Sequence, residues 1–236
     1  MRPTRAGRGD GTVRAAVVVP AGGAGRRMGG ERKPYLELGG EPVLVHALRP
    51  FLERPEIGLA VVALPSADAD APPAWLTGLD ARIEVVAGGR ERSDSVRNAL
   101  EVVPEAADVV LIHDAARPLV SAAVVDRVLR RACEGLAEGV GVIAAIPAAD
   151  TIKEVDAAGR ILRTPERSSL RRAQTPQAFP RGVIVEAHRR AREDGIGATD
   201  DAALVERCGG TVVVVDGEPE NLKVTTPADL AMAEAL

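Results

Sequence analysis

Short runs of β-branched residues alternate along this chain with stretches whose apolar residues recur at helical spacing. This alternation is typical of an α/β fold with a mainly parallel sheet, because each crossover between parallel strands carries a helix. We expect strands over residues 13–19, 59–64, 82–86, 108–112, 142–146 and 211–215. We expect helices over residues 42–53, 92–103, 121–138 and 180–194, and two more that begin near residues 199 and 226.

Local signals fix several boundaries. Ser121 precedes a helical pattern as an N-cap, and Thr226-Pro-Ala-Asp229 is a capping box with proline at the first helical position. The Pro- and Asp-rich stretch 65–74 predicts an irregular surface segment. Two short alternating stretches around the turn 156–159 predict a hairpin, part of a β-arm over about residues 148–173. This hairpin has too little apolar surface to stand alone, so we expect it to pack on another subunit.

The totals exclude several classes of protein. Aromatic residues make up only 2% of the 236 residues and the formal net charge is -4, so we expect no nucleic-acid partner. Two cysteines far apart and three scattered histidines form no zinc pattern, which is typical of a reducing compartment. The apolar run 15–19 is too short to cross a bilayer, and no signal-peptide core follows the basic start, so we expect a cytoplasmic protein without a membrane partner. Residues 1–12 are expected to be a disordered tail, and residues 13–236 one domain.

A glycine-rich loop, Pro20-Ala-Gly-Gly-Ala-Gly-Arg-Arg-Met28, follows the first expected strand. Such a turn exposes backbone N–H groups that bind anions. It lacks the third glycine of a dinucleotide fingerprint and the Gly-Lys-Ser/Thr of a P-loop. Arg26, Arg27 and Lys33 instead supply cations suited to a triphosphate. By itself the loop favours the simpler interpretation, a tight turn carrying solvated arginines.

Three further segments lie at or near strand ends. In Gly88-Gly-Arg-Glu-Arg-Ser-Asp-Ser-Val96 the glycines allow close approach to a flat base, and Ser93 or Ser95 would cap the next helix or bind the nucleotide. In His113-Asp-Ala-Ala-Arg-Pro118, which follows the most hydrophobic strand, Asp114 would hold a phosphate-bound Mg²⁺ and Arg117 a second phosphate. An Asx turn with a surface arginine is the alternative.

The fourth segment, Glu220-Asn-Leu-Lys-Val-Thr-Thr-Pro227, follows the last expected strand. Lys223 lies between apolar neighbours, so we expect its stem to be buried and its ammonium to point into a site. A solvated lysine is the common alternative at such a position.

Taken in order, the stretches PAGGAGRRM, RKPYLELGG, GGRERSDSV, HDAARP, ADTIK, TPQAF and ENLKVTTPADL resemble the 2-C-methyl-D-erythritol 4-phosphate cytidylyltransferases. The likeness covers roughly residues 13–236. It implies a GT-A-like, Rossmann-like domain, a β-arm exchanged across a homodimer, and Mg²⁺ as cofactor. The implied reaction transfers CMP from CTP to a sugar-alcohol phosphate in the non-mevalonate isoprenoid pathway.

The resemblance also implies residue roles. Arg27 and Lys33 would stabilise charge on the α-phosphate, while Lys223 and a partner subunit's copy of Arg167 would position the acceptor. The cytidine contacts would come from Ala21, Gly22, Gly23, Gly25, Gly89 and Ser95. The acceptor pocket would be lined by Asp114, Arg117, Thr151, Thr175 and Thr199.

The sequence departs from the family pattern at Lys33-Pro34, where proline favours an extended backbone at the lysine, and at Arg90 and Glu220. A phosphomonoester acceptor is already anionic, so the reaction needs positioning and charge neutralisation rather than a general base. Three alternatives stay open: a ribitol 5-phosphate cytidylyltransferase, a nucleotidyltransferase for another nucleotide, and a non-catalytic nucleotide-binding dimer module.

Overall fold

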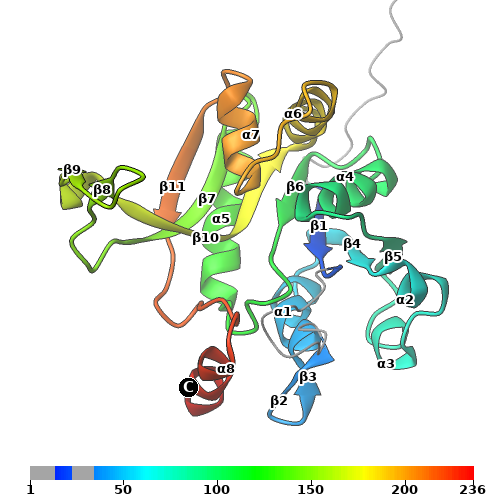
Figure 1. The fold of residues 1–236 in the computed structure, drawn as a ribbon. Coiled ribbons are helices and arrows are strands. Elements are labelled where there is room, and N and C mark those ends of the chain that lie inside the picture. The colour runs from blue at the N-terminus through cyan, green and yellow to red at the C-terminus, as the bar shows by residue number, and fades with distance from the viewer. Residues whose placement is uncertain (1–13, 23–34) are drawn as a thin grey trace, which may run out of the picture.

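A computed structural model describes residues 14–22 and 35–236 and is built around a seven-stranded sheet (Figure 1). The strand order is β11-β7-β10-β6-β1-β4-β5, and only β10 runs antiparallel to its two neighbours, β6 and β7. These strands are β1 Ala15–Pro20, β4 Ile57–Leu64, β5 Ile83–Ala87, β6 Val109–Ile112, β7 Gly141–Pro147, β10 Arg171–Pro180 and β11 Val212–Asp216. The predicted mainly parallel α/β sheet is confirmed.

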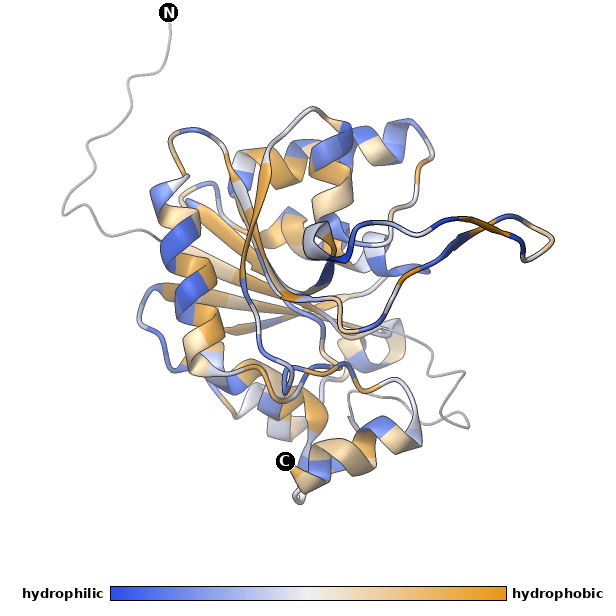
Figure 2. Cartoon of the chain, turned by 90° about the vertical axis from the view of Figure 1, so that its left-hand side faces the viewer, coloured by the Kyte–Doolittle hydropathy of each residue, from blue (hydrophilic) through white to orange (hydrophobic). Residues whose placement is uncertain are grey.

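Helices cover both faces of the sheet, and each face has its own apolar core. In β1, Val17 and Val19 pack under α1 and α5, whereas Ala16 and Val18 pack under α4, α6 and α7. This alternation follows from the two-residue period of a strand whose two faces are both buried. The helices are α1 Val43–Leu52, α4 Arg92–Val102, α5 Ala122–Glu134, α6 Arg181–Glu193 and α7 Asp201–Arg207. Figure 2 shows the apolar strands between these helices.

Most predicted boundaries hold within a few residues, and the exceptions have local causes. Residues 65–74 are not irregular throughout, because α2 spans Ser66–Asp70 and α3 spans Ala74–Thr77. The helix after Ser121 begins as predicted, with the Ser121 hydroxyl accepting a hydrogen bond from Val124 N at 3.1 Å. It ends at Glu134 rather than near residue 138, since Gly135 forms its C-cap.

The predicted hairpin is present and projects from the body of the domain (Figure 1). It pairs β8 Glu154–Val155 with β9 Ile161–Arg163, and a short 3₁₀ turn, Arg167–Ser169, leads back to β10. Ile161 and Leu162 are each 61% exposed at its tip. Apolar side chains this exposed on a two-stranded arm are typical of a surface that another chain covers.

A third, smaller core joins the C-terminal helix α8, Pro227–Ala235, to the hairpin of β2 Glu37–Leu38 and β3 Glu41–Pro42. The predicted capping box of α8 is confirmed: Thr226 Oγ1 accepts a hydrogen bond from Asp229 N, and the Asp229 carboxylate accepts one from Thr226 N. The predicted tail over residues 1–12 and the loop residues Gly23, Gly25, Arg26, Arg27 and Lys33 lie outside the described residues. Within the described ranges, no helix combines the length and apolarity that crossing a membrane requires.

Candidate active site

The carboxyl ends of β1, β5 and β6 open into one pocket, here called the strand-end pocket. Ligands of open α/β sheets collect at this edge, because the loops that follow neighbouring strands meet there. The pocket is lined by Pro20, Ala21, Gly22, Gly89, Arg90, Glu91, Arg92, Ser95, Asp114, Ala115, Ala116 and Lys223. The structure thus brings together six sequence-predicted site residues from four separate segments: Ala21, Gly22, Gly89, Ser95, Asp114 and Lys223.

One wall of the strand-end pocket is bare backbone. A Cβ on Gly22 would lie 3.3 Å from the Ser95 hydroxyl, and one on Gly89 would lie 2.1 Å from the Asp94 Cβ. The Ser95 hydroxyl accepts a hydrogen bond from Gly89 N and donates to Glu91 O, both at 3.1 Å, which fixes the loop against α4. Ser95 therefore shapes the wall and does not cap the helix; the N-cap is Glu91. Gly22 and Gly89 carry no side chain, so their backbone lines the pocket directly, which suits a flat ring lying against it.

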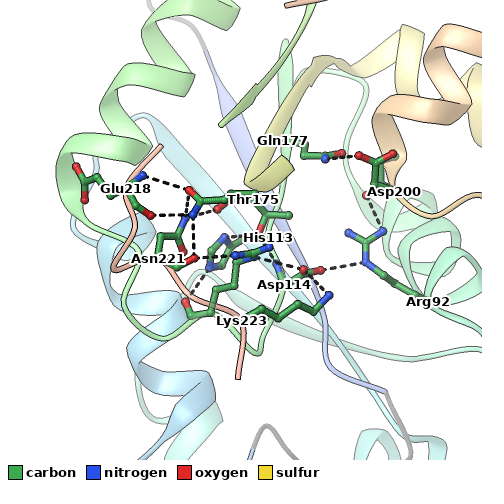
Figure 3. Close-up of polar contacts among 12 residues, drawn as sticks. Arg92, His113, Asp114, Thr175, Gln177, Asp200, Glu218, Asn221 and Lys223 are labelled. Atoms are coloured by element: carbon green, nitrogen blue, oxygen red, sulfur yellow. Dashed lines mark hydrogen bonds and ion pairs between the residues drawn. The ribbon is translucent and has the colours of Figure 1, made fainter. Parts of the chain in front are cut away.

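Asp114 is the centre of the charged part of the pocket (Figure 3). Its Oδ1 accepts a hydrogen bond from Arg92 Nε at 3.0 Å, and its Oδ2 lies 2.8 Å from Lys223 Nζ. The Arg117 Nε lies 3.6 Å from the same Oδ2. Burial by itself would raise the pKa of Asp114, but Arg92, Lys223 and Arg117 outweigh it and hold that pKa well below its usual range. Asp114 is thus a fixed anion that holds three cations in place.

The backbone of Asp114 is held by a buried hydrogen-bond chain. Asp114 N donates to Thr175 Oγ1 at 3.0 Å, and this hydroxyl lies 3.0 Å from His113 Nδ1. His113 Nε2 lies 3.2 Å from Arg117 O, which only accepts, so Nε2 carries the proton and Nδ1 accepts from Thr175. Burial lowers the pKa of His113 to about 4, so the ring is neutral near pH 7. Thr175 therefore contributes to the site by supporting the backbone of Asp114.

Lys223 is aimed at the pocket by the segment before it. The Gln174 side chain donates from Nε2 to Glu218 O at 2.7 Å, and Asn221 donates from Nδ2 to Thr175 O at 2.9 Å. Val224 N then donates to Ala116 O at 2.8 Å, which ties the segment to the loop after β6. The predicted direction of the ammonium is correct, but the predicted burial of the stem is wrong, since the Lys223 side chain is 44% exposed.

A second, adjacent pocket lies between β10 and the C-terminal segment and is here called the C-terminal pocket. Lys223 lines both pockets, whereas Arg117 lines only the second. The Arg117 Nη1 donates to Asn221 O at 2.7 Å. The remaining residues that line the C-terminal pocket are Ile146, Arg172, Ala173, Gln174, Pro219, Glu220, Asn221, Leu222, Thr225, Asp229, Met232 and Leu236. Lys223 therefore lies at the junction of two cavities.

Four of the predicted residues that the structure describes line neither pocket within one chain: Thr151, Arg167, Thr175 and Thr199. Thr175 is buried, and its hydroxyl accepts from Asp114 N instead of lining the acceptor pocket. Thr151 and Arg167 are exposed on the β-arm, where the Arg167 guanidinium donates to Ala149 O at 3.2 Å. Thr199 is exposed in the loop before α7. That loop lies near the rim of the strand-end pocket, because a Cβ on Gly197 would lie 4.0 Å from the Glu91 carboxylate.

Sequence reasoning missed Arg92, the neutral His113 and the buried amides of Gln174 and Asn221. Arg92 begins α4 and bridges Asp114 to Asp201, which lies at the start of α7. Its place directly after the Gly88-Gly89 turn was the available signal, since a side chain in the first helical turn after a strand faces the same edge of the sheet. No pattern in the sequence pointed to the distant partner.

Among the described residues, no group of three histidine, cysteine or acidic side chains is arranged to hold a metal ion. Both oxygens of Asp114 already contact cations. A divalent ion would have to compete with Arg92 and Lys223 for this carboxylate, so the donor set does not fit a resident magnesium site made by the described residues.

Comparisons with known proteins agree with the geometry. The family model described as IspD, 2-C-methyl-D-erythritol 4-phosphate cytidylyltransferase, matches residues 15–236. A protein of that name from Symbiobacterium thermophilum is 45% identical over 225 residues, which cover 95% of this chain and 93% of the relative. Another from Frankia casuarinae is 48% identical, covering 94% of this chain and 81% of the relative.

Solved structures give the same fold. A 4-diphosphocytidyl-2C-methyl-D-erythritol synthase from Anaerococcus prevotii superposes with a TM-score of 0.83 at 28% identity, covering 95% of this chain and 98% of that one. A 2-C-methyl-D-erythritol 4-phosphate cytidylyltransferase from Thermus thermophilus superposes with a TM-score of 0.76 at 33% identity, covering 92% and 96%.

Proposed function

The chain belongs to the 2-C-methyl-D-erythritol 4-phosphate cytidylyltransferase family, and from this membership and its two joined pockets we propose how it carries out that reaction. It transfers CMP from CTP to 2-C-methyl-D-erythritol 4-phosphate and releases pyrophosphate, a step of non-mevalonate isoprenoid biosynthesis. The observation that carries the proposal is the position of Lys223, whose ammonium lies at the junction of the two pockets, 2.8 Å from Asp114.

CTP occupies the strand-end pocket. The bare backbone of Gly22 and Gly89 packs against the cytosine ring, beside the loop that Ser95 fixes. We expect the size of this pocket to select cytosine over a purine. The triphosphate lies toward the loop after β1, where Arg27 and Lys33, together with Gly23 and Gly25, are proposed to bind it. We expect turnover with CTP but not with ATP or GTP, and comparable turnover with a purine nucleotide would contradict this arrangement.

The acceptor phosphate lies beside Lys223. One N–H of the Lys223 ammonium bonds Asp114, which fixes the direction of the ammonium. Its two other N–H groups are left to bind the acceptor phosphate. Arg117 lines this side of the site, and Thr175 supports it through its hydrogen bond with Asp114 N. Thr199, in the loop near the rim, stays a proposed acceptor contact. We assign Thr151 and Arg167 to the acceptor site of the partner subunit, because both lie on the projecting β-arm and neither reaches a pocket of its own chain.

The chemistry is an in-line displacement. An oxygen of the acceptor phosphate attacks the α-phosphorus of CTP, one P–O bond forms, and the bond to the β-phosphate breaks with its electron pair leaving on pyrophosphate. The acceptor is already an anion, so no proton has to be removed. Catalysis consists of positioning two anions and neutralising the charge that grows on the α-phosphate, which three cations around Asp114 favour.

Mg²⁺ enters this proposal as part of the substrate, the magnesium complex of CTP. Because both Asp114 oxygens contact Arg92 and Lys223, we assign Asp114 to orienting these cations. The contact between Asp114 and Mg²⁺ stays a prediction from the sequence, tested by measuring whether Asp114→Asn changes the Mg²⁺ concentration that gives half-maximal rate.

We further propose that the chain works as a homodimer in the cytoplasm. The apolar tip of the β-arm fits a surface on a second copy, and Cys133 and Cys208 are both unpaired, as in a reducing compartment. A dimeric mass by light scattering supports the first proposal, and a monomer at assay concentration contradicts it.

The test is a pyrophosphate-release assay with CTP and Mg²⁺ that compares 2-C-methyl-D-erythritol 4-phosphate with ribitol 5-phosphate. We expect turnover with the methylerythritol compound and little with ribitol 5-phosphate. Preference for ribitol 5-phosphate would keep the chemistry and change the acceptor. CTP binding without turnover on either acceptor would identify a non-catalytic binding module.

A further inference from the structure

Arg92 links the strand-end pocket to a buried carboxylate that lies outside it. Its Nε donates to Asp114 Oδ1 at 3.0 Å, and its Nη1 lies 2.8 Å from Asp201 Oδ2 (Figure 3 shows Arg92 and Asp114). Asp201 lines neither the strand-end pocket nor the C-terminal pocket. Within the described part of the chain, the Asp201 carboxylate pairs with Arg92 and His188, and Arg92 is the partner that reaches the pocket.

Asp201 is held rigidly at the start of α7. His188 Nε2, on α6, lies 3.0 Å from Asp201 Oδ1, and both side chains are almost completely buried, at 3% and 1% exposure. Gln177 on β10 fixes the end of α7: its Nε2 donates to Asp200 Oδ2 at 2.9 Å, and its Oε1 accepts from Ala202 N at 3.1 Å. The carboxylate therefore has a defined position relative to the sheet.

Burying this charged pair lowers the stability of the fold, because two ionic groups lose their hydration. Burial by itself would lower the pKa of Arg92, but Asp201 and Asp114 outweigh it and raise that pKa, so the guanidinium stays charged. Apolar side chains of similar volume would hold the starts of α4 and α7 together as well. What they would not supply is a planar guanidinium that bonds Asp114 through Nε while its Nη1 is anchored on Asp201.

We propose that Arg92, anchored by Asp201 and His188, is a positioning residue for the transfer reaction. By holding Asp114 Oδ1, it leaves Oδ2 directed at Lys223 and so keeps the ammonium at the junction of the two pockets. The inference rests on the proposed role of Lys223 as the acceptor-binding cation. It assigns α6 and α7, which line neither of the two pockets, a part in catalysis.

The test compares Arg92→Gln, Arg92→Lys and Asp201→Asn with the wild type in steady-state assays that vary each substrate. We expect Arg92→Gln to lower kcat by about a hundredfold, since misplacing a positioned group by about 1 Å has effects of that size. Arg92→Lys keeps the charge but not the fork, so it should retain more activity. Asp201→Asn should lower kcat roughly tenfold, because Arg92 keeps its bond to Asp114 but loses its anchor.

Two readouts separate positioning from stability and from direct nucleotide binding. The KM for CTP should stay within about threefold of wild type, while kcat and the KM for the acceptor change. The double variant Arg92→Gln/Asp201→Asn should be no slower than Arg92→Gln, because both act through one contact. The control is Arg54→Gln, which removes a buried arginine paired with Asp126 at 2.6 Å and lining neither pocket. It should lower Tm and leave kcat within about twofold.

The proposal is overturned if Arg92→Gln keeps wild-type kcat, if Asp201→Asn has no effect, or if the two effects multiply in the double variant. A selective rise in the KM for CTP would assign Arg92 to nucleotide binding instead. Should Arg92→Gln fail to fold, Arg92→Lys and Asp201→Asn carry the same comparison. An inactive wild type would contradict the proposed function, whereas an active wild type with active variants would contradict only the role of Arg92.

Discussion

Gly89→Ala tests the bare-backbone wall of the strand-end pocket. A Cβ on Gly89 would lie 2.1 Å from the Asp94 Cβ and 3.2 Å from the Asp94 carbonyl carbon. Carbon atoms in contact lie about 3.5–4.0 Å apart, so the loop would have to move by roughly 1.5 Å. The atom nearest to the added Cβ belongs to the first turn of α4. The backbone of this helix is fixed by its own hydrogen bonds, so the loop and not the helix should move.

The movement has two energetic consequences. Overpacking of a tight contact costs about 1–3 kcal/mol. Separating Gly89 N from the buried Ser95 hydroxyl, now 3.1 Å away, adds about 1 kcal/mol. We therefore expect the free energy of unfolding to fall by about 2–4 kcal/mol. Because the displaced backbone is the proposed cytosine contact, the Kd for CTP should rise by roughly tenfold to a hundredfold.

Denaturant unfolding and calorimetric titration with CTP measure these two quantities. Gly182→Ala is the matched control, because a Cβ there meets no atom within 4 Å and the backbone conformation is ordinary. It should leave CTP binding unchanged and not destabilise α6. If Gly89→Ala binds CTP within threefold of wild type and unfolds at the same denaturant concentration, the loop does not form the wall described.

The other predictions concern the acceptor site, the buried histidine and the arm. Lys223→Ala should lower kcat/KM for the acceptor by about a hundredfold while the Kd for CTP changes little; equal loss for both substrates would contradict the assignment. Lys33→Ala should lower kcat by at least about a hundredfold with the fold intact, and near-normal kcat would remove Lys33 from the mechanism. The pKa of His113 is lowered from about 6.5 to about 4 in the folded chain, so the unfolded chain binds more protons between these values and stability falls as pH falls through that window. From pH 7 to pH 5 this contributes a loss of about 2 kcal/mol in denaturant unfolding, and an unchanged midpoint would show that His113 is not held neutral. Replacing both Ile161 and Leu162 at the arm tip by aspartate should convert a dimer into monomers in light scattering; a persisting dimer would place the interface elsewhere.

The sheet and the strand-end pocket could be predicted because their signals are local. A run such as Val109–Ile112 is apolar at every position, as a strand buried on both faces requires, and it does lie in the middle of the sheet. Ser121 and Thr226 were found from capping patterns, which depend on a few adjacent residues. Chemistry at the ends of such strands follows from the parallel topology.

The remaining features depend on contacts that no local pattern encodes. The five-residue helix α2 buries none of its residues and so has no apolar periodicity to detect. The apolar neighbours of Lys223 suggested a buried stem. In an extended segment, however, neighbouring side chains point to opposite sides, so a buried Val224 directs Lys223 away from the core and toward the pockets. The pairing of Arg92 with Asp201 joins two helices far apart in sequence, and only the packing of α4 and α7 against α6 creates it.

The reaction itself is tested most directly by tracing oxygen. Wild-type protein is incubated with CTP, Mg²⁺ and 2-C-methyl-D-erythritol 4-phosphate whose phosphate oxygens carry ¹⁸O, and the products are analysed by ³¹P NMR and mass spectrometry. Attack of the acceptor phosphate on the α-phosphorus predicts that all label stays in 4-diphosphocytidyl-2-C-methyl-D-erythritol, including its bridging oxygen, and that pyrophosphate is unlabelled. Label in pyrophosphate, or an acceptor diphosphate formed together with CDP, would contradict the account.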